Sequence, residues 1–182
     1  AINKSLRGIN AVGTTQSYVL LIAILREFKK MEFERIYKIF EQVENFTFFY
    51  HGVCKGPGNK VERFWNRMCT ALISDVVKET DRDTKLTAVT NWRNELKNYL
   101  SNLMSENLFR EKFPNNIVYK NSSKARSLAK YFLKRMIYET NPEGLDDTVV
   151  SLEHILPQNP TKWGLTKQEI KSYVNSIGNL TL

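Results

Sequence analysis

The chain has 182 residues, with 27 Lys and Arg against 19 Asp and Glu, which gives a net charge of +8. A chain of this length can bury a hydrophobic core, and its longest apolar run, residues 18–25, is too short to cross a membrane. The two cysteines, Cys54 and Cys69, lack zinc-site spacing, which indicates free thiols in a reducing compartment and predicts a cytoplasmic protein. The positive excess favours a polyanionic partner such as nucleic acid, although a lysine-rich surface that merely keeps the protein soluble explains it equally well.

Most of the chain before residue 141 has the apolar spacing of amphipathic helices. The aromatic run at residues 46–50 fits either a short strand or a buried connection, and the Gly-Pro-Gly segment at residues 56–58 predicts a loop. Pro114 is expected to interrupt the helical region, and the Asn-Pro-Glu-Gly segment at residues 141–144 to end it. In chain order, the spacing predicts helices over residues 16–30, 32–43, 61–78, 83–108 and 124–140.

The spacing also predicts which side of each helix is buried. Aromatic residues at helical positions, such as Trp65 and Trp92, are expected in the core rather than as platforms for stacked bases. In the first predicted helix the inward positions are Tyr18, Leu21, Ile22, Leu25 and Phe28.

The residues after position 145 follow a different pattern. Residues 148–152 are β-branched and predict a strand, Trp163 and Gly164 a turn, and residues 166–177 a short helix, with a second strand beginning at Gly178. The predicted fold is therefore mainly α: a multi-helix bundle over residues 1–144, followed by a small α/β unit over residues 145–182.

Glu153 and His154 stand side by side at the end of the first predicted strand. Hydrolysis of a phosphodiester bond needs a base that deprotonates water and a cation that neutralises the phosphate and the departing 3′ oxygen. Because successive side chains of a strand project to opposite sides, this pair offers an imidazole and a carboxylate from one place in the backbone. A carboxylate suits Mg²⁺ or Mn²⁺ better than zinc. A Glu-His pair by itself, however, is common and has no catalytic meaning in most proteins.

Three further residues fit supporting roles around this pair. Pro157 is expected to end the strand and to stiffen the loop that follows His154. Gly178 is expected to let the chain pass close to that loop, where the amide of Asn179 bonds the backbone and fixes the position of the imidazole.

The helix predicted over residues 124–140 has a basic side. This side suits contact with a phosphate backbone, and an ordinary solvated helix surface explains it as well. Its members are Lys124, Arg126, Lys130, Lys134 and Arg135.

Taken together, the motif Glu-His-Ile-Leu-Pro-Gln at residues 153–158, Trp163, and Asn-Ser-Ile-Gly-Asn-Leu-Thr-Leu at residues 175–182 resembles the C-terminal nuclease domain of GmrSD-type modification-dependent restriction endonucleases, an HNH-like family. Residues 148–182 carry the resemblance, whereas residues 1–145 resemble the middle region of these proteins only in helicity and order. The resemblance implies that His154 is the general base, Glu153 the metal-site acid and Asn179 the middle asparagine of the HNH pattern. Pro157 and Gly178 match supporting positions of the motif.

The resemblance implies a metal-dependent endonuclease that cuts foreign DNA with modified bases in a phage-defence restriction system. In this family nucleotide hydrolysis belongs to a separate N-terminal module, whose Asp-Gly-Gln-Arg type motif is missing from this sequence, so we expect no NTP to bind here. The family's closing helix, with a further Asn and a Lys, is also missing. We therefore expect a chain truncated at both ends, with an incomplete ββα-metal (HNH-like) unit whose final metal ligand lies beyond Leu182. Such a chain is expected to bind metal poorly, and activity is expected of the intact protein rather than of this piece.

A non-catalytic alternative remains open. In it the helical bundle is a DNA-binding or partner-docking module, and the C-terminal motif is a degenerate HNH remnant kept for structure. A steep salt dependence of DNA binding without metal-dependent cleavage would favour this alternative.

Overall fold

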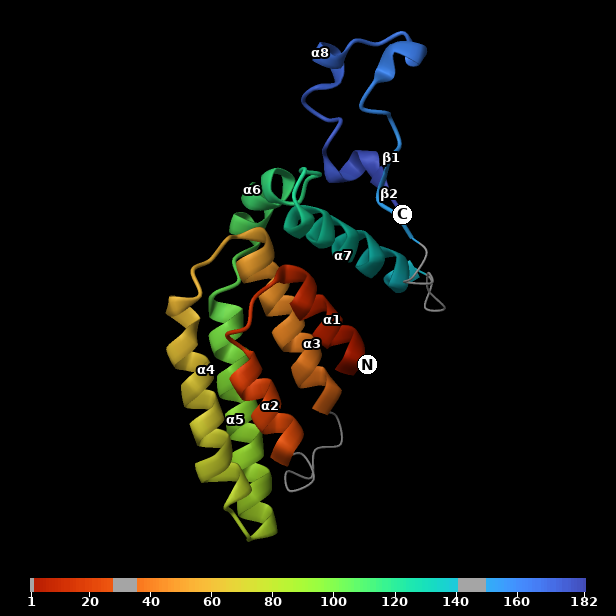
Figure 1. Cartoon of the computed structure of the whole chain (residues 1–182). Helices are drawn as coiled ribbons and strands as arrows, with labels where there is room; N and C mark the ends of the chain where they lie inside the picture. Colours follow the sequence, from red (N-terminus) through yellow and green to blue (C-terminus); the bar gives the residue numbers. More distant parts are fainter. Residues whose placement is uncertain (1, 28–35, 141–149) are drawn as a thin grey trace. The chain divides into compact units, whose positions relative to one another are not determined.

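The computed structural model describes residues 2–27, 36–140 and 150–182 (Figure 1). These residues are mainly helical, with eight α-helices and one two-stranded antiparallel sheet near the C-terminus, which confirms the predicted fold class. Parts of the predicted helices over residues 16–30 and 32–43, and the predicted helix stop at residues 141–144, lie outside the described residues.

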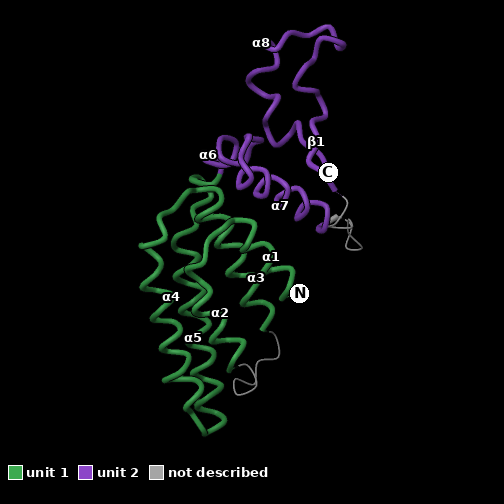
Figure 2. Tube along the Cα trace, in the orientation of Figure 1, with its two compact units in different colours: residues 1–109 green, residues 110–182 purple. Residues whose placement is uncertain are grey.

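The chain divides into two compact units, Ala1–Phe109 and Arg110–Leu182 (Figure 2). The predicted boundary between residues 144 and 145 falls outside the described residues and stays a prediction. No helix within the described ranges is long and apolar enough to span a lipid bilayer.

Unit 1 is a helical bundle in which α1 packs on α3, and α2 packs on α4 (Figure 1). The long helix α5 packs against the π-helical segment η3. Helix α1 had no counterpart among the predicted elements. The elements of this unit are α1 (Ile2–Val12), α2 (Tyr18–Glu27), α3 (Ile36–Thr47), the π-helical segment η2 (Phe48–Val53), α4 (Asn59–Ala71), η3 (Leu72–Val77) and α5 (Arg82–Asn102).

Two tryptophans lie in the core of unit 1, as their helical spacing predicted. Trp65 is fully buried in α4, and Trp92 is buried in α5. The indole Nε1 of Trp92 donates a hydrogen bond of 2.9 Å to the main-chain oxygen of Met68, so the core contact also satisfies the polar end of the ring.

The predicted buried side of α2 is partly wrong. Leu20, Leu21 and Ile24 are buried, whereas Ile22 is 63% exposed and Leu25 is 40% exposed. The helix is apolar around nearly its whole circumference, so hydrophobic spacing does not distinguish its buried side from the others.

The aromatic run at residues 46–50, predicted as a short strand or a buried connection, is helical. It lies where α3 passes into the π-helical segment η2. Phe46 stacks on Tyr50 with 5.1 Å between the ring centroids, and His51 Nδ1 lies 2.9 Å from the main-chain oxygen of Gly56. Packing of the aromatic rings along one side of the helix therefore favours continued helix here.

The helix predicted over residues 83–108 is divided in two by the structure. Asp81 caps α5, accepting hydrogen bonds from the main-chain nitrogen and the hydroxyl of Thr84. These bonds lower the pKa of Asp81 below its ordinary value. Helix α5 ends at Asn102, and α6 (Glu106–Asn116) begins after Ser105.

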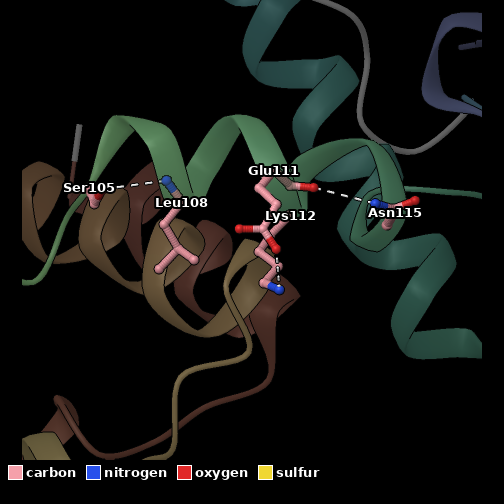
Figure 3. A network of polar contacts seen from close by, with 5 residues as sticks. All are labelled: Ser105, Leu108, Glu111, Lys112 and Asn115. Carbon is pink, nitrogen blue, oxygen red and sulfur yellow. Dashed lines mark hydrogen bonds and ion pairs between the residues drawn. The ribbon is translucent and has the colours of Figure 1, made fainter.

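Figure 3 shows how side chains support the two ends of α6. Ser105 Oγ accepts a bond of 3.4 Å from the main-chain nitrogen of Leu108, so a new N-cap restarts the helix after the break. Near the other end, Asn115 Nδ2 donates to the main-chain oxygen of Glu111 at 3.3 Å, and Lys112 pairs with the Glu111 carboxylate at 2.7 Å. The interruption predicted at Pro114 is confirmed: α6 ends at Asn116, with Pro114 in its last turn, and the next helix begins only at Ser123.

Unit 2 contains one long helix and a C-terminal segment of short elements. The predicted helix over residues 124–140 is present, whereas the strand predicted over residues 148–152 is not: residues 150–152 are irregular, residues 148 and 149 lie outside the described ranges, and the pairing begins at Glu153. The elements are α7 (Ser123–Thr140), β1 (Glu153–His154), the 3-10 helix η4 (Pro160–Trp163), α8 (Lys167–Ile170), the 3-10 helix η5 (Ile177–Asn179) and β2 (Leu180–Thr181).

The helix predicted over residues 166–177 starts as expected and ends early. Thr166 and Glu169 form a capping box, and the bonds from the main-chain nitrogen and hydroxyl of Thr166 lower the pKa of Glu169 below its ordinary value. The α-helix ends at Ile170, because the residues that follow pair with another part of the chain. Ser176 forms a β-bridge with Val118, and the main-chain oxygen of Asn175 accepts a 2.8 Å hydrogen bond from the main-chain nitrogen of Tyr119.

Candidate active site

The two-stranded sheet places the Glu-His pair directly opposite the end of the chain. Glu153 pairs with Thr181 and His154 pairs with Leu180 in antiparallel register. One further bond of 2.9 Å, from the main-chain nitrogen of Ile155 to the oxygen of Asn179, continues the pairing into the loop after His154. Glu153 is exposed and His154 is half-buried, as expected of neighbours on opposite sides of a strand.

The imidazole of His154 is surrounded by residues from three parts of unit 2. Its Nε2 lies 3.1 Å from Asn175 Oδ1 and 3.4 Å from Gln158 Nε2. The ring of Tyr119 packs edge-to-face against the imidazole, with 4.6 Å between the ring centroids and an interplanar angle of 68°. The ring is therefore both hydrogen-bonded and packed, while the residue keeps access to solvent.

Asn179 fastens the loop that follows His154. Its amide Nδ2 donates to the main-chain oxygens of Leu156 at 3.0 Å and Val174 at 2.8 Å, and its Oδ1 accepts from the nitrogen of Leu156 at 2.9 Å. These are contacts to the loop backbone of the kind that the sequence led us to expect. The catalytic importance of Asn179, like that of Glu153 and His154, stays a prediction.

The surroundings of Glu153 suit a weakly held hard cation. Ser151 Oγ donates to Glu153 Oε1 at 2.6 Å. Among the described residues no cluster of three or more His, Cys, Asp and Glu side chains is present, so this part of the chain contains no closed site of the structural zinc kind. Mg²⁺ differs from zinc in this respect, because one or two carboxylates together with water and substrate phosphates hold it. Glu153 fits such a donor set.

The structure gives no support to the predicted reason for a glycine at position 178. A Cβ built at Gly178 meets no atom within 4 Å, so a side chain has room at this position and the approach of the chain to the loop does not require a glycine. Pro157 follows the loop residue Leu156 and is half-buried. Whether either residue supports catalysis stays a prediction.

Alanine substitutions at Gly164 and Gly178 compare how much each glycine contributes to stability. Gly164, at the turn after η4, has φ 72°, a left-handed conformation that costs a residue with a side chain about 1 kcal/mol. We expect Gly164→Ala to lower the free energy of unfolding by about that amount, and Gly178→Ala to change it by less than about 0.5 kcal/mol. Urea denaturation measures both variants. Equal losses at the two positions would show that Gly178 has a packing role.

The five basic residues predicted for one side of α7 differ in their exposure. Lys124 is exposed, whereas Arg126, Lys130, Lys134 and Arg135 are half-buried. Arg126 donates to Asn121 Oδ1 at 3.0 Å, and Lys130 donates to the main-chain oxygen of Val150. Contact of these five residues with DNA stays a prediction.

Three residues around His154 were not identified as site residues from the sequence. Asn175 and Gln158 belong to the motif segments but have no distinctive spacing to the histidine, and Tyr119 lies before α7 in the chain. Tyr119 and Asn175 are next to Val118 and Ser176, whose β-bridge joins parts of the chain far apart in sequence.

Comparison with known proteins gives one match. Residues 103–182 match the family model described as GmrSD restriction endonucleases, C-terminal domain. No curated protein and no solved structure matches the chain. The matched residues include α6, α7, the sheet and all the residues that surround His154.

Proposed function

Residues 103–182 belong to the C-terminal domain family of the GmrSD restriction endonucleases, and from this premise we propose that the protein is a metal-dependent DNA endonuclease of the HNH type. Its substrate is foreign DNA, including DNA with modified bases, and its role is phage defence in the cytoplasm. The observation that carries the proposal is the placement of His154: a half-buried imidazole, bonded at one nitrogen, next to an exposed carboxylate on the same short strand.

In this proposal His154 acts as the general base. The imidazole takes a proton from a water molecule, whose oxygen then attacks the phosphorus atom of the scissile bond. The bond from phosphorus to the 3′ oxygen breaks, and the departing oxygen takes a proton from solvent. A bound divalent cation, Mg²⁺ or Mn²⁺, supplies charge neutralisation on the phosphate and on the departing oxygen.

The other residues of the site hold the reacting groups in place. The carboxylate of Glu153 provides a hard oxygen for the cation, with Ser151 bonded to one of its two oxygens. Asn179 fixes the loop of Leu156, and so keeps the backbone that follows His154 in one position. Positioning of this kind lowers the barrier because the base and the water need no reorganisation at the moment of reaction.

The test of this proposal is the metal dependence of plasmid cleavage by the complete protein. We expect Glu153→Gln to lower the cleavage rate at limiting Mn²⁺ by about tenfold or more, and higher Mn²⁺ to restore part of it, because the substitution removes a ligand charge. Glu111→Gln, at an exposed carboxylate on α6 that pairs with Lys112, is the matched control and should cut like the wild type.

Two results would contradict the proposal. Cleavage that is unaffected by a chelator would exclude the metal, and a Glu153→Gln variant with wild-type metal dependence would remove Glu153 from the site. The same assay on phage DNA with and without modified bases measures the preference for modification.

A further inference from the structure

The imidazole of His154 belongs to a cluster of three polar side chains. Asn175 Oδ1 lies 3.1 Å from His154 Nε2, and Gln158 Nε2 donates to the same oxygen at 3.2 Å. The third distance, between Gln158 Nε2 and His154 Nε2, is 3.4 Å and is the longest of the three. Asn175 Oδ1 is thus the point on which the two other groups converge.

The chemistry of these groups determines which nitrogen of His154 carries the proton. A carboxamide oxygen only accepts hydrogen bonds, so the bond to Asn175 Oδ1 requires a hydrogen on His154 Nε2. The amino group of Gln158 only donates, so its 3.4 Å contact with His154 Nε2 would need a lone pair on that nitrogen. The shorter bond to Asn175 Oδ1 decides between the two tautomers, because the two lone pairs of that oxygen accommodate both donors. A neutral imidazole has a single N–H, which leaves the lone pair on Nδ1. Within the described part of the chain, Nδ1 of His154 has no hydrogen-bond partner.

The backbone of Asn175 holds a second neighbour of the ring. Its main-chain oxygen accepts a 2.8 Å bond from the nitrogen of Tyr119, whose aromatic ring meets the imidazole of His154. The side chain of Asn175 therefore sets the hydrogen bond of the imidazole, while its backbone helps to place the aromatic ring that packs edge-to-face against the imidazole.

We propose that Asn175, assisted by Gln158, is a positioning residue that keeps His154 in the tautomer with the proton on Nε2 and so leaves Nδ1 free to accept the proton of the attacking water. This inference rests on the proposed function of His154 as the general base. Loss of the bond would let the ring populate the other tautomer, in which Nδ1 carries a hydrogen and accepts no proton.

Nitrogen NMR of the histidine rings tests the inference without any cleavage assay. The chain has two histidines, so His51→Gln leaves His154 as the single ring signal. Spectra are recorded at a pH where the ring is neutral. The wild-type side chain should show the proton on Nε2. Asn175→Leu, which keeps the size but not the acceptor, should give a mixture of tautomers, whereas Asn175→Asp, which keeps an acceptor oxygen, should retain the wild-type form.

Either of two spectra would overturn the inference: a wild-type ring with its proton on Nδ1, or an Asn175→Leu variant with the wild-type tautomer. Gln158→Met is a second variant at an exposed side chain, where the fold is not at risk. Like Asn175→Leu, it should lower the proportion of the form with the proton on Nε2, but by less. An increase in that proportion would show that Gln158 does not assist Asn175.

Kinetics of the complete protein provide the second readout. We expect Asn175→Leu to lower kcat by roughly tenfold to a hundredfold with little change in KM, and Asn175→Asp to restore part of the loss. An unchanged kcat in a variant whose tautomer has shifted would remove the positioning role. If the wild-type protein cut no DNA, the proposed function would fail while the NMR result on the tautomer still stood, so the two failures are distinguishable.

Discussion

Replacement of His154 by alanine in the complete protein should reduce the rate constant of DNA cleavage by about 10²–10⁴ while leaving the fold and DNA binding intact. This range is the usual contribution of a general base, and His154 is the residue in the described part of the site that offers a nitrogen base to water. The side chain is half-buried at the edge of a two-residue strand, so its removal leaves no large cavity in either unit. The measurement is single-turnover cleavage with enzyme in excess over DNA.

The second histidine of the chain provides the control. His51 lies in unit 1, where Nδ1 contacts the main-chain oxygen of Gly56 at 2.9 Å and the ring edge packs on Phe46 and Tyr50. His51→Gln should cut DNA at the wild-type rate after any loss of stability is taken into account. An His154→Ala variant as active as His51→Gln would exclude His154 as the base.

Replacement of Asn179 by alanine should strongly destabilise unit 2. The substitution removes three hydrogen bonds to the main chain, at Leu156 N, Leu156 O and Val174 O. At about 1 kcal/mol for each bond, we expect the free energy of unfolding to fall by about 3 kcal/mol. The loop after His154 should also lose its fixed position, and cleavage should fall together with protection of the Leu156 amide against hydrogen exchange.

Asn179→Asp distinguishes the donor half of the amide from the acceptor half. The aspartate still accepts from Leu156 N but donates to neither carbonyl oxygen, and its charge faces both of them. We therefore expect it to be at least as destabilising as Asn179→Ala. A fully stable Asn179→Asp variant would mean that the two donated bonds contribute little and that Asn179 has another role.

The helical body was predictable from the sequence where apolar spacing selects one side, and not elsewhere. Trp65 and Trp92 lie at buried positions of α4 and α5 as their spacing indicated. Helix α2 is apolar on most sides, and Ile22 and Leu25 are consequently exposed where burial was expected. The break between α5 and α6 depends on the cap at Ser105, a local hydrogen bond that periodicity does not detect.

The residues of the candidate site were predictable from adjacency and motif order, whereas their surroundings were not. Glu153, His154 and Asn179 stand out because a motif places them at fixed spacings. Asn175 and Tyr119 contact the imidazole, and they lie next to the bridge between Val118 and Ser176, which no local sequence pattern predicts. The pairing of Glu153 and His154 with Leu180 and Thr181 also joins distant parts of the sequence, and local alternation does not reveal it.

The most direct test of the central claim is incubation of the complete wild-type protein with supercoiled DNA, in Mg²⁺ and in a chelator. We expect nicked or linear product with Mg²⁺ and intact DNA with the chelator. Intact DNA under both conditions, on modified and unmodified substrates alike and with the protein folded and bound to DNA, would exclude metal-dependent cleavage by this protein. That result would instead support a DNA-binding helical module with an inactive HNH remnant.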